Sequence, residues 1–128
     1  MSKKKSLKKK ILIVEDEKIL AEMYHDIFVN AGFEVISVVE SKEALKITKK
    51  ERPDLIILDI LLPREDGLFF LEWLKKDPEI AAISVIIFTN YDGVEARRKA
   101  IDLGVKDYLI KADFTPQQLV EKAKSYLE

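Results

Sequence analysis

Acidic side chains stand directly after two apolar runs of this chain. Asp59 follows residues 55–58, and the stretch Glu15-Asp16-Glu17 follows residues 11–14. Because buried parallel strands deliver the residues after them to one edge of a sheet, we expect these carboxylates to lie close together. Several carboxylates in one crevice repel one another unless a hard cation with oxygen ligands lies among them. The sequence therefore predicts a Mg²⁺ site beside Asp59.

A carboxylate in such a place can accept a phosphoryl group. Phosphoryl transfer depends mainly on positioning and on charge stabilisation, so the acceptor needs cationic and hydroxyl partners. Lys111 follows the apolar run 108–110 and can neutralise one phosphoryl oxygen, and Thr89 ends the run before it and can donate to another. Taken singly, these residues are as readily explained as a turn, a surface charge and a helix cap. Their shared position after successive strands is what indicates a site.

The elements that must position these residues alternate as strands and helices. We expect strands at residues 11–14, 34–39, 55–58, 85–88 and 108–110. We expect helices at residues 19–28, 42–51, 67–74 and 94–103, and from Pro116 onward. Ser41 and Thr115 are the expected N-caps, and Gly32 and Gly104 are expected to end their helices. Strict alternation with short connections predicts a parallel α/β sheet covered on both faces.

Composition excludes several classes of protein. The chain has 128 residues, which fits one domain, and it contains no cysteine, so disulfides and thiolate metal sites are excluded. Six of the first ten residues are lysines, so the other 118 carry a net charge of −7 against −1 for the whole chain. An acidic body is poorly suited to nucleic acid, and no apolar run approaches the length of a membrane span. We predict a disordered basic tail at residues 1–9, a folded domain at 10–128 and a cytoplasmic location.

From about Lys10 to Leu127 the motifs resemble the receiver domains of bacterial two-component response regulators, in particular single-domain, chemotaxis-regulator-like ones. The resemblance rests on the acidic cluster, the segment from Asp59 to Gly67, and the residues Thr89, Tyr108 and Lys111 at their strand ends. It implies a flavodoxin-like (βα)5 fold with sheet order 2-1-3-4-5. It also implies that Asp59 takes a phosphoryl group from a sensor histidine kinase or a phosphotransfer protein. Such a chain is a signalling phosphoacceptor that assists its own phosphorylation, rather than an enzyme.

The same resemblance assigns the metal ligands and the switch. Asp16 and Asp59 would bind Mg²⁺ directly, the backbone carbonyl of Leu61 would supply a third oxygen, and Glu15 would reach the ion through water. Thr89 would move toward the phosphoryl group and Tyr108 would turn inward. The face made by the fourth helix, fifth strand and fifth helix would then change its affinity for a protein target. This face would include Tyr91, Arg97, Arg98, Lys106 and Lys111, and the protein would be a monomer or a phosphorylation-dependent dimer.

Three departures from the family pattern qualify these expectations. Ala112 replaces the usual proline after the lysine, so the bond before it is either strained or trans. Asn90 replaces a small residue, so access for small phosphoryl donors is predicted to be narrower. Leu61 and Tyr91 flank the route of an attacking water without a carboxylate or amide to orient it, which predicts a long-lived acyl phosphate.

Two other functions fit the sequence less well, and two more stay open. A dehalogenase-type phosphatase needs a second acid where Leu61 stands, and a flavin-binding domain needs a neutral loop where Glu15-Asp16-Glu17 stands. A phosphorelay intermediate would use the same site and stays an alternative. A receiver-like interaction module that is not phosphorylated also stays open, since Asn90 and Ala112 alter the pocket.

Overall fold

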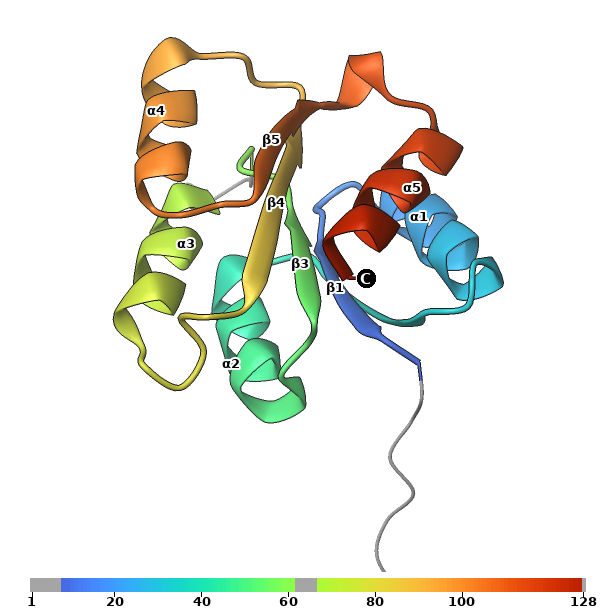
Figure 1. Ribbon diagram of the computed structural model, residues 1–128, viewed down its shortest axis with the longest axis horizontal. Coiled ribbons are helices and arrows are strands. Elements are labelled where there is room, and N and C mark those ends of the chain that lie inside the picture. The colour runs from blue at the N-terminus through green and yellow to red at the C-terminus, as the bar shows by residue number, and fades with distance from the viewer. Residues whose placement is uncertain (1–7, 62–66, 128) are drawn as a thin grey trace, which may run out of the picture.

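Five parallel strands form one sheet in the order β2-β1-β3-β4-β5 in the computed structural model, which describes residues 8–61 and 67–127 (Figure 1). The strands are β1 (Lys10–Val14), β2 (Glu34–Val38), β3 (Leu55–Leu58), β4 (Ser84–Thr89) and β5 (Asp107–Ile110). Both the predicted flavodoxin-like fold and the predicted strand order are confirmed. Ser37 is exposed on β2, in keeping with the position of this strand at the edge of the sheet.

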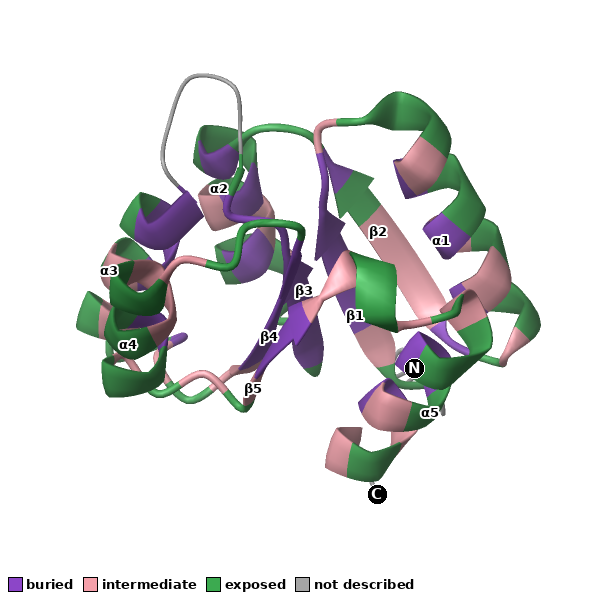
Figure 2. Cartoon of the chain, turned by 90° about the horizontal axis from the view of Figure 1, so that it is seen from above, coloured by how far each residue is buried: buried purple, intermediate pink, exposed green. Residues whose placement is uncertain are grey.

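Helices cover both faces of the sheet (Figure 2). They are α1 (Lys18–Asn30), α2 (Ser41–Glu51), α3 (Gly67–Lys76), α4 (Val94–Asp102) and α5 (Pro116–Leu127), with a short 3₁₀ helix η1 (Lys111–Asp113) after β5. α1 and α5 lie on one face, and α2, α3 and α4 lie on the other. This is the covering that strict strand-helix alternation predicts.

Successive residues of the central strands enter two separate apolar layers. In β1, Ile11 and Ile13 pack toward α1 and α5, whereas Leu12 and Val14 pack toward α2 and α3. All four residues of β3 are buried as well, because a strand inside a parallel sheet has no solvent face. The middle of the sheet is therefore apolar on both sides, and polar chemistry is confined to the ends of the strands.

Helix boundaries follow the predicted signals with one exception. Gly32 and Gly104 have φ of +100° and +88°, the left-handed backbone that ends a helix. Thr115 Oγ1 accepts the Gln118 N–H at 3.1 Å, and the Gln118 side chain accepts the Thr115 N–H at 2.8 Å, which makes a reciprocal cap before Pro116. The prediction that Ser41 is an N-cap is wrong: Glu40 holds the extended N-cap position, and Ser41 is already the buried first residue of α2.

Some expectations fall outside the described residues or are narrowed by the structure. Most of the predicted basic tail, and residues 62–66 of the segment after Asp59, lie outside them. All peptide bonds between described residues are trans, which includes the bond between Lys111 and Ala112. None of the described helices combines the length and the apolar character needed to cross a membrane.

Candidate functional site

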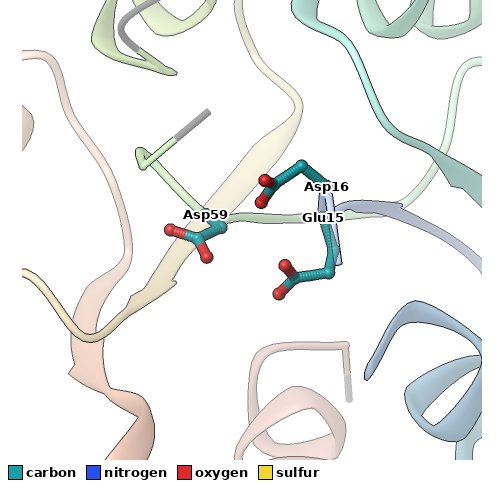
Figure 3. Close-up of side chains that lie close together, drawn as sticks. All are labelled: Glu15, Asp16 and Asp59. Atoms are coloured by element: carbon teal, nitrogen blue, oxygen red, sulfur yellow. The ribbon is translucent and has the colours of Figure 1, made fainter. Parts of the chain in front are cut away.

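Asp59 is the centre of a buried polar cluster at the carboxyl end of β3. The parallel register pairs Leu58 with Val14, so the residues after these strands, Asp59 and Glu15, are neighbours. Asp59 is anchored by its own N–H, which donates to the Val14 carbonyl at 3.0 Å, and the residue is only 6% exposed. One carboxylate oxygen from each of Glu15, Asp16 and Asp59 lies within 4.8 Å of the others, and Figure 3 shows the three side chains close together. The predicted convergence of carboxylates is therefore observed.

Both carboxylate oxygens of Asp59 are held by donors from other segments. Oδ1 accepts the Thr89 hydroxyl at 2.8 Å and the Leu61 N–H at 2.9 Å. Oδ2 accepts the Lys111 ammonium at 2.7 Å. Three strand ends thus contribute to one carboxylate: β3 supplies it, β4 brings the hydroxyl, and β5 brings the ammonium. The structure brings Asp59, Thr89 and Lys111 together as the sequence predicted.

Lys111 is shared between two carboxylates. Its Nζ also donates to Glu15 Oε1, and both side chains are almost completely buried. The second oxygen of Glu15 accepts the Glu17 N–H at 3.1 Å. Burial raises the pKa of Glu15, and this effect outweighs its contacts with Lys111 and the Glu17 N–H. Burial also opposes the charge on Lys111, but hydrogen bonds to Asp59 and Glu15 raise its pKa overall.

Asp16 is the least buried of the three carboxylates. It is half-buried, and no hydrogen-bond donor for it is found within residues 8–61 and 67–127. Glu15, in contrast, has both oxygens engaged by protein donors. The donor set of Asp16 and Asp59 is made of hard oxygens, which suits Mg²⁺ or another hard divalent cation. The cluster can therefore bind a metal, with Asp16 as the most accessible ligand.

The expected switch residues are connected through the backbone at Tyr91. The Thr89 hydroxyl accepts the Tyr91 N–H at 3.3 Å, and the Tyr108 hydroxyl donates to the Tyr91 carbonyl at 2.6 Å. Tyr108 is 5% exposed, and the Arg97 guanidinium lies 4.6 Å from the centre of its ring. Tyr108 is thus inside in this structure, covered by α4. Lys111 points into the site, so it does not belong to the outer face in which the sequence placed it.

Two contacts of the site were not predicted from the sequence. One is the pairing of Glu15 with Lys111. The other joins Asn90 and Ala112: the Asn90 side-chain carbonyl accepts the Ala112 N–H at 3.2 Å. Parallel pairing of the fourth and fifth predicted strands was the available signal, because it places the residues that follow them side by side.

The parallel sheet thus gathers acidic side chains, a lysine and a hydroxyl at one edge. The chain belongs to the response regulator receiver domain family, whose sequence pattern matches residues 11–124. One relative is a polar-differentiation response regulator DivK from Brucella anthropi, 34% identical over 119 residues that cover 93% of this chain and 96% of the relative. Another is a probable transcriptional regulator ycf27 from Porphyridium aerugineum, 32% identical over 94% of this chain. The chain spans about half (48%) of that longer relative.

Solved structures show the same fold. A CheY-like receiver domain protein from Methanospirillum hungatei is 29% identical, with a TM-score of 0.87 and coverage of 94% of both chains. The Mn²⁺-bound form of the response regulator Rcp1 is 26% identical with a TM-score of 0.80, covering 94% of this chain and 95% of that one. The phosphorylated cyanobacterial phytochrome response regulator RcpA is 31% identical with a TM-score of 0.79, covering 92% and 90%.

Proposed function

We propose that Asp59 is the phosphoryl acceptor of a two-component system and that the donor is a phosphohistidine of a sensor kinase or phosphotransfer protein. An Asp59 carboxylate oxygen forms the new bond to phosphorus while the bond from phosphorus to the imidazole nitrogen breaks. The electron pair of that bond stays on the imidazole, so no proton has to leave the acceptor. The single observation that supports this proposal most is the convergence of Thr89 and Lys111 on Asp59, at 2.8 and 2.7 Å.

The roles of the partners follow from charge. Lys111 loses its contact with Asp59 Oδ2 when that oxygen is esterified, and its ammonium then neutralises a phosphoryl oxygen. Thr89 donates its proton to a second phosphoryl oxygen in a hydrogen bond. Glu15 keeps Lys111 at the site throughout, because it holds the ammonium from the opposite side. The chain thereby supplies positioning and electrostatics for its own phosphorylation.

Asp16, Asp59 and the Leu61 backbone carbonyl are the proposed ligands of Mg²⁺, and Glu15 is an outer ligand that acts through water. The open Asp16 carboxylate supports this assignment, and so does a related receiver, Rcp1, solved in a Mn²⁺-bound form. The bound cation would offset the negative charge that gathers when a phosphoryl group enters an acidic pocket. No other role is needed from it.

Output is proposed to pass from Thr89 through the Tyr91 backbone to Tyr108. A phosphoryl group would compete for the Thr89 hydroxyl, which now joins Asp59 to the Tyr91 N–H. Movement there would be transmitted to the Tyr108 hydroxyl and to Arg97 above its ring. The partner is proposed to be a protein bound at the face of α4, β5 and α5, because that face carries charges of both signs.

The test is intact mass spectrometry after incubation with acetyl phosphate, with and without Mg²⁺. We expect a Mg²⁺-dependent gain of one phosphoryl group that is lost in Asp59→Asn. Asp113→Asn is the matched control, because Asp113 is an exposed carboxylate just outside the site. The rate at which the phosphorylated species decays also tests the predicted long lifetime of the acyl phosphate, which was inferred from Leu61 and Tyr91. A chain that takes no phosphoryl group from acetyl phosphate or from phosphohistidine donors would be an interaction module instead.

A further inference from the structure

The two segments that bring Thr89 and Lys111 to Asp59 are joined by a hydrogen bond of their own. β4 and β5 pair as far as Thr89 and Ile110, so the next residues, Asn90 and Lys111, leave the sheet side by side. The Asn90 side-chain carbonyl then accepts the Ala112 N–H at 3.2 Å. Each residue of this bond directly follows a residue that contacts Asp59. The hydrogen bond between Asn90 and Ala112, called the brace below, therefore joins the segment that carries Thr89 to the segment that carries Lys111.

The brace gives a hydrogen-bond acceptor to a backbone N–H at the start of the turn after β5. Lys111–Asp113 forms a single 3₁₀ turn, closed by the Phe114 N–H donating to the Lys111 carbonyl at 3.2 Å. The first N–H groups of such a turn have no partner within it, and the residue before it, Ile110, provides no side-chain cap. Asn90, the residue after β4, supplies the missing acceptor. The turn that carries Lys111 is thus capped by a residue 22 positions away.

We propose that Asn90 is a positioning residue for Lys111. By holding the Ala112 N–H, it fixes the turn from which the Lys111 side chain reaches Glu15 and Asp59. Asn90 itself forms no hydrogen bond with Glu15 or Asp59 in the part of the chain that the structure describes. This inference rests on the proposed function for its effect on phosphorylation, but the positioning of the ammonium is a property of the chain alone.

A competing explanation is that Asn90 acts only through its bulk, by narrowing the entrance for small donors. Asn90→Leu separates the two, because leucine has nearly the same size but no hydrogen-bond acceptor. If bulk alone matters, this variant behaves like the wild type. If the brace matters, Ala112 loses its partner, the turn loosens, and Lys111 is held less firmly.

Nuclear magnetic resonance of the unphosphorylated protein tests the brace directly. We expect faster hydrogen exchange of the Ala112 amide in Asn90→Leu, by about two- to tenfold, the range that one net hydrogen bond supplies. The Lys111 ammonium protons should also exchange faster. Asn90→Asp keeps an acceptor oxygen and should preserve the protection of the amide. An unchanged Ala112 amide in Asn90→Leu would overturn the proposal, and so would a faster amide with an unchanged Lys111 ammonium.

A double-mutant cycle links the brace to phosphorylation. Ala112→Pro removes the N–H donor of the brace. Asn90→Leu should therefore slow phosphorylation by acetyl phosphate about two- to tenfold in the wild-type background and have no further effect when Ala112→Pro is already present. Equal effects in both backgrounds would overturn the positioning role, because an effect of bulk is the same in each. If the wild type accepts no phosphoryl group, the proposed function fails, and the exchange measurements still decide the brace.

Discussion

Two clusters of carboxylates and lysine in this molecule are built in opposite ways. In one, Asp107 on β5 accepts the Tyr126 hydroxyl at 2.6 Å, the Tyr108 N–H at 2.9 Å and the Lys122 ammonium at 3.4 Å. One partly exposed carboxylate is therefore surrounded by donors. In the other, the single ammonium of Lys111 serves both Glu15 and Asp59, with the third carboxylate of Asp16 close by.

The difference separates a structural cluster from a functional one. The Asp107 cluster is fully satisfied and fastens α5 to β5, so every change in it should weaken the fold. Among residues 8–61 and 67–127, the Asp59 cluster has three carboxylates and one ammonium, in a place where charge is costly to bury. A bound cation would offset this negative charge, whereas the phosphoryl group of the proposed function would add to it.

Removal of the lysine from each cluster should give the largest contrast. Lys111→Met leaves buried carboxylates without their ammonium, so we expect a loss of roughly 3 kcal/mol of unfolding free energy in Mg²⁺-free buffer. Mg²⁺ should restore more stability to this variant than to the wild type, because it replaces the lost positive charge. Urea denaturation with EDTA and with Mg²⁺ measures both effects.

Lys122→Met is the matched control in the Asp107 cluster. Its side chain is 42% exposed and its ammonium lies 3.4 Å from the carboxylate, so we expect a loss below about 1 kcal/mol and no dependence on Mg²⁺. If the two variants lost equal stability, or if Mg²⁺ affected both alike, the distinction between the clusters would be wrong.

Neutralisation of each aspartate should change stability in opposite directions. Asp107→Asn weakens bonds from three donors, so we expect a loss of about 1–2 kcal/mol. Asp59→Asn removes one of two carboxylates that compete for Lys111, so its stability should equal or exceed that of the wild type. Urea denaturation in Mg²⁺-free buffer compares the pair, and a less stable Asp59→Asn would argue that the site is as well balanced as the Asp107 cluster.

The fold was predictable because the strands are short and mostly apolar, and because helices with recognisable start or stop signals separate them. The run 55–58 can only be buried, Gly32 and Gly104 need left-handed backbone, and Thr115-Pro116 starts a helix on local grounds alone. Strand ends then follow from topology, which is why Asp59, Thr89 and Lys111 could be placed together. Ser41 was misjudged because the pattern that marks a cap does not fix which of two adjacent residues first becomes helical.

The contacts that were not predicted from the sequence depend on where side chains extend in the folded chain, which the pattern of residue types does not show. Glu15 pairs with Lys111, a residue 96 positions away, and this pairing depends on how the two side chains extend in the folded chain. The bond from Asn90 to Ala112 requires the register of β4 and β5 beyond their last pair. The bond from Tyr126 to Asp107 joins residues 19 apart, across the packing of α5 on the sheet.

A smaller effect than that of Lys111→Met is expected from the phenol of Tyr126, and it depends on pH. The hydrogen bond to Asp107 raises the pKa of Tyr126 from the ordinary 10.0 to about 12. Although burial opposes its ionisation, contacts with Tyr126, the Tyr108 N–H and Lys122 lower the pKa of Asp107 overall. The folded state therefore favours a neutral phenol, and the stability from this bond is complete below about pH 10 and is lost as the pH rises through about 12.

Tyr126→Phe should cost about 1 kcal/mol at pH 8, and the difference from the wild type should shrink between pH 10 and 12. Urea denaturation of both proteins across that range measures it. No difference at pH 8 would mean that Tyr126 stabilises α5 through the packing of its ring, which phenylalanine keeps, and not through its hydroxyl.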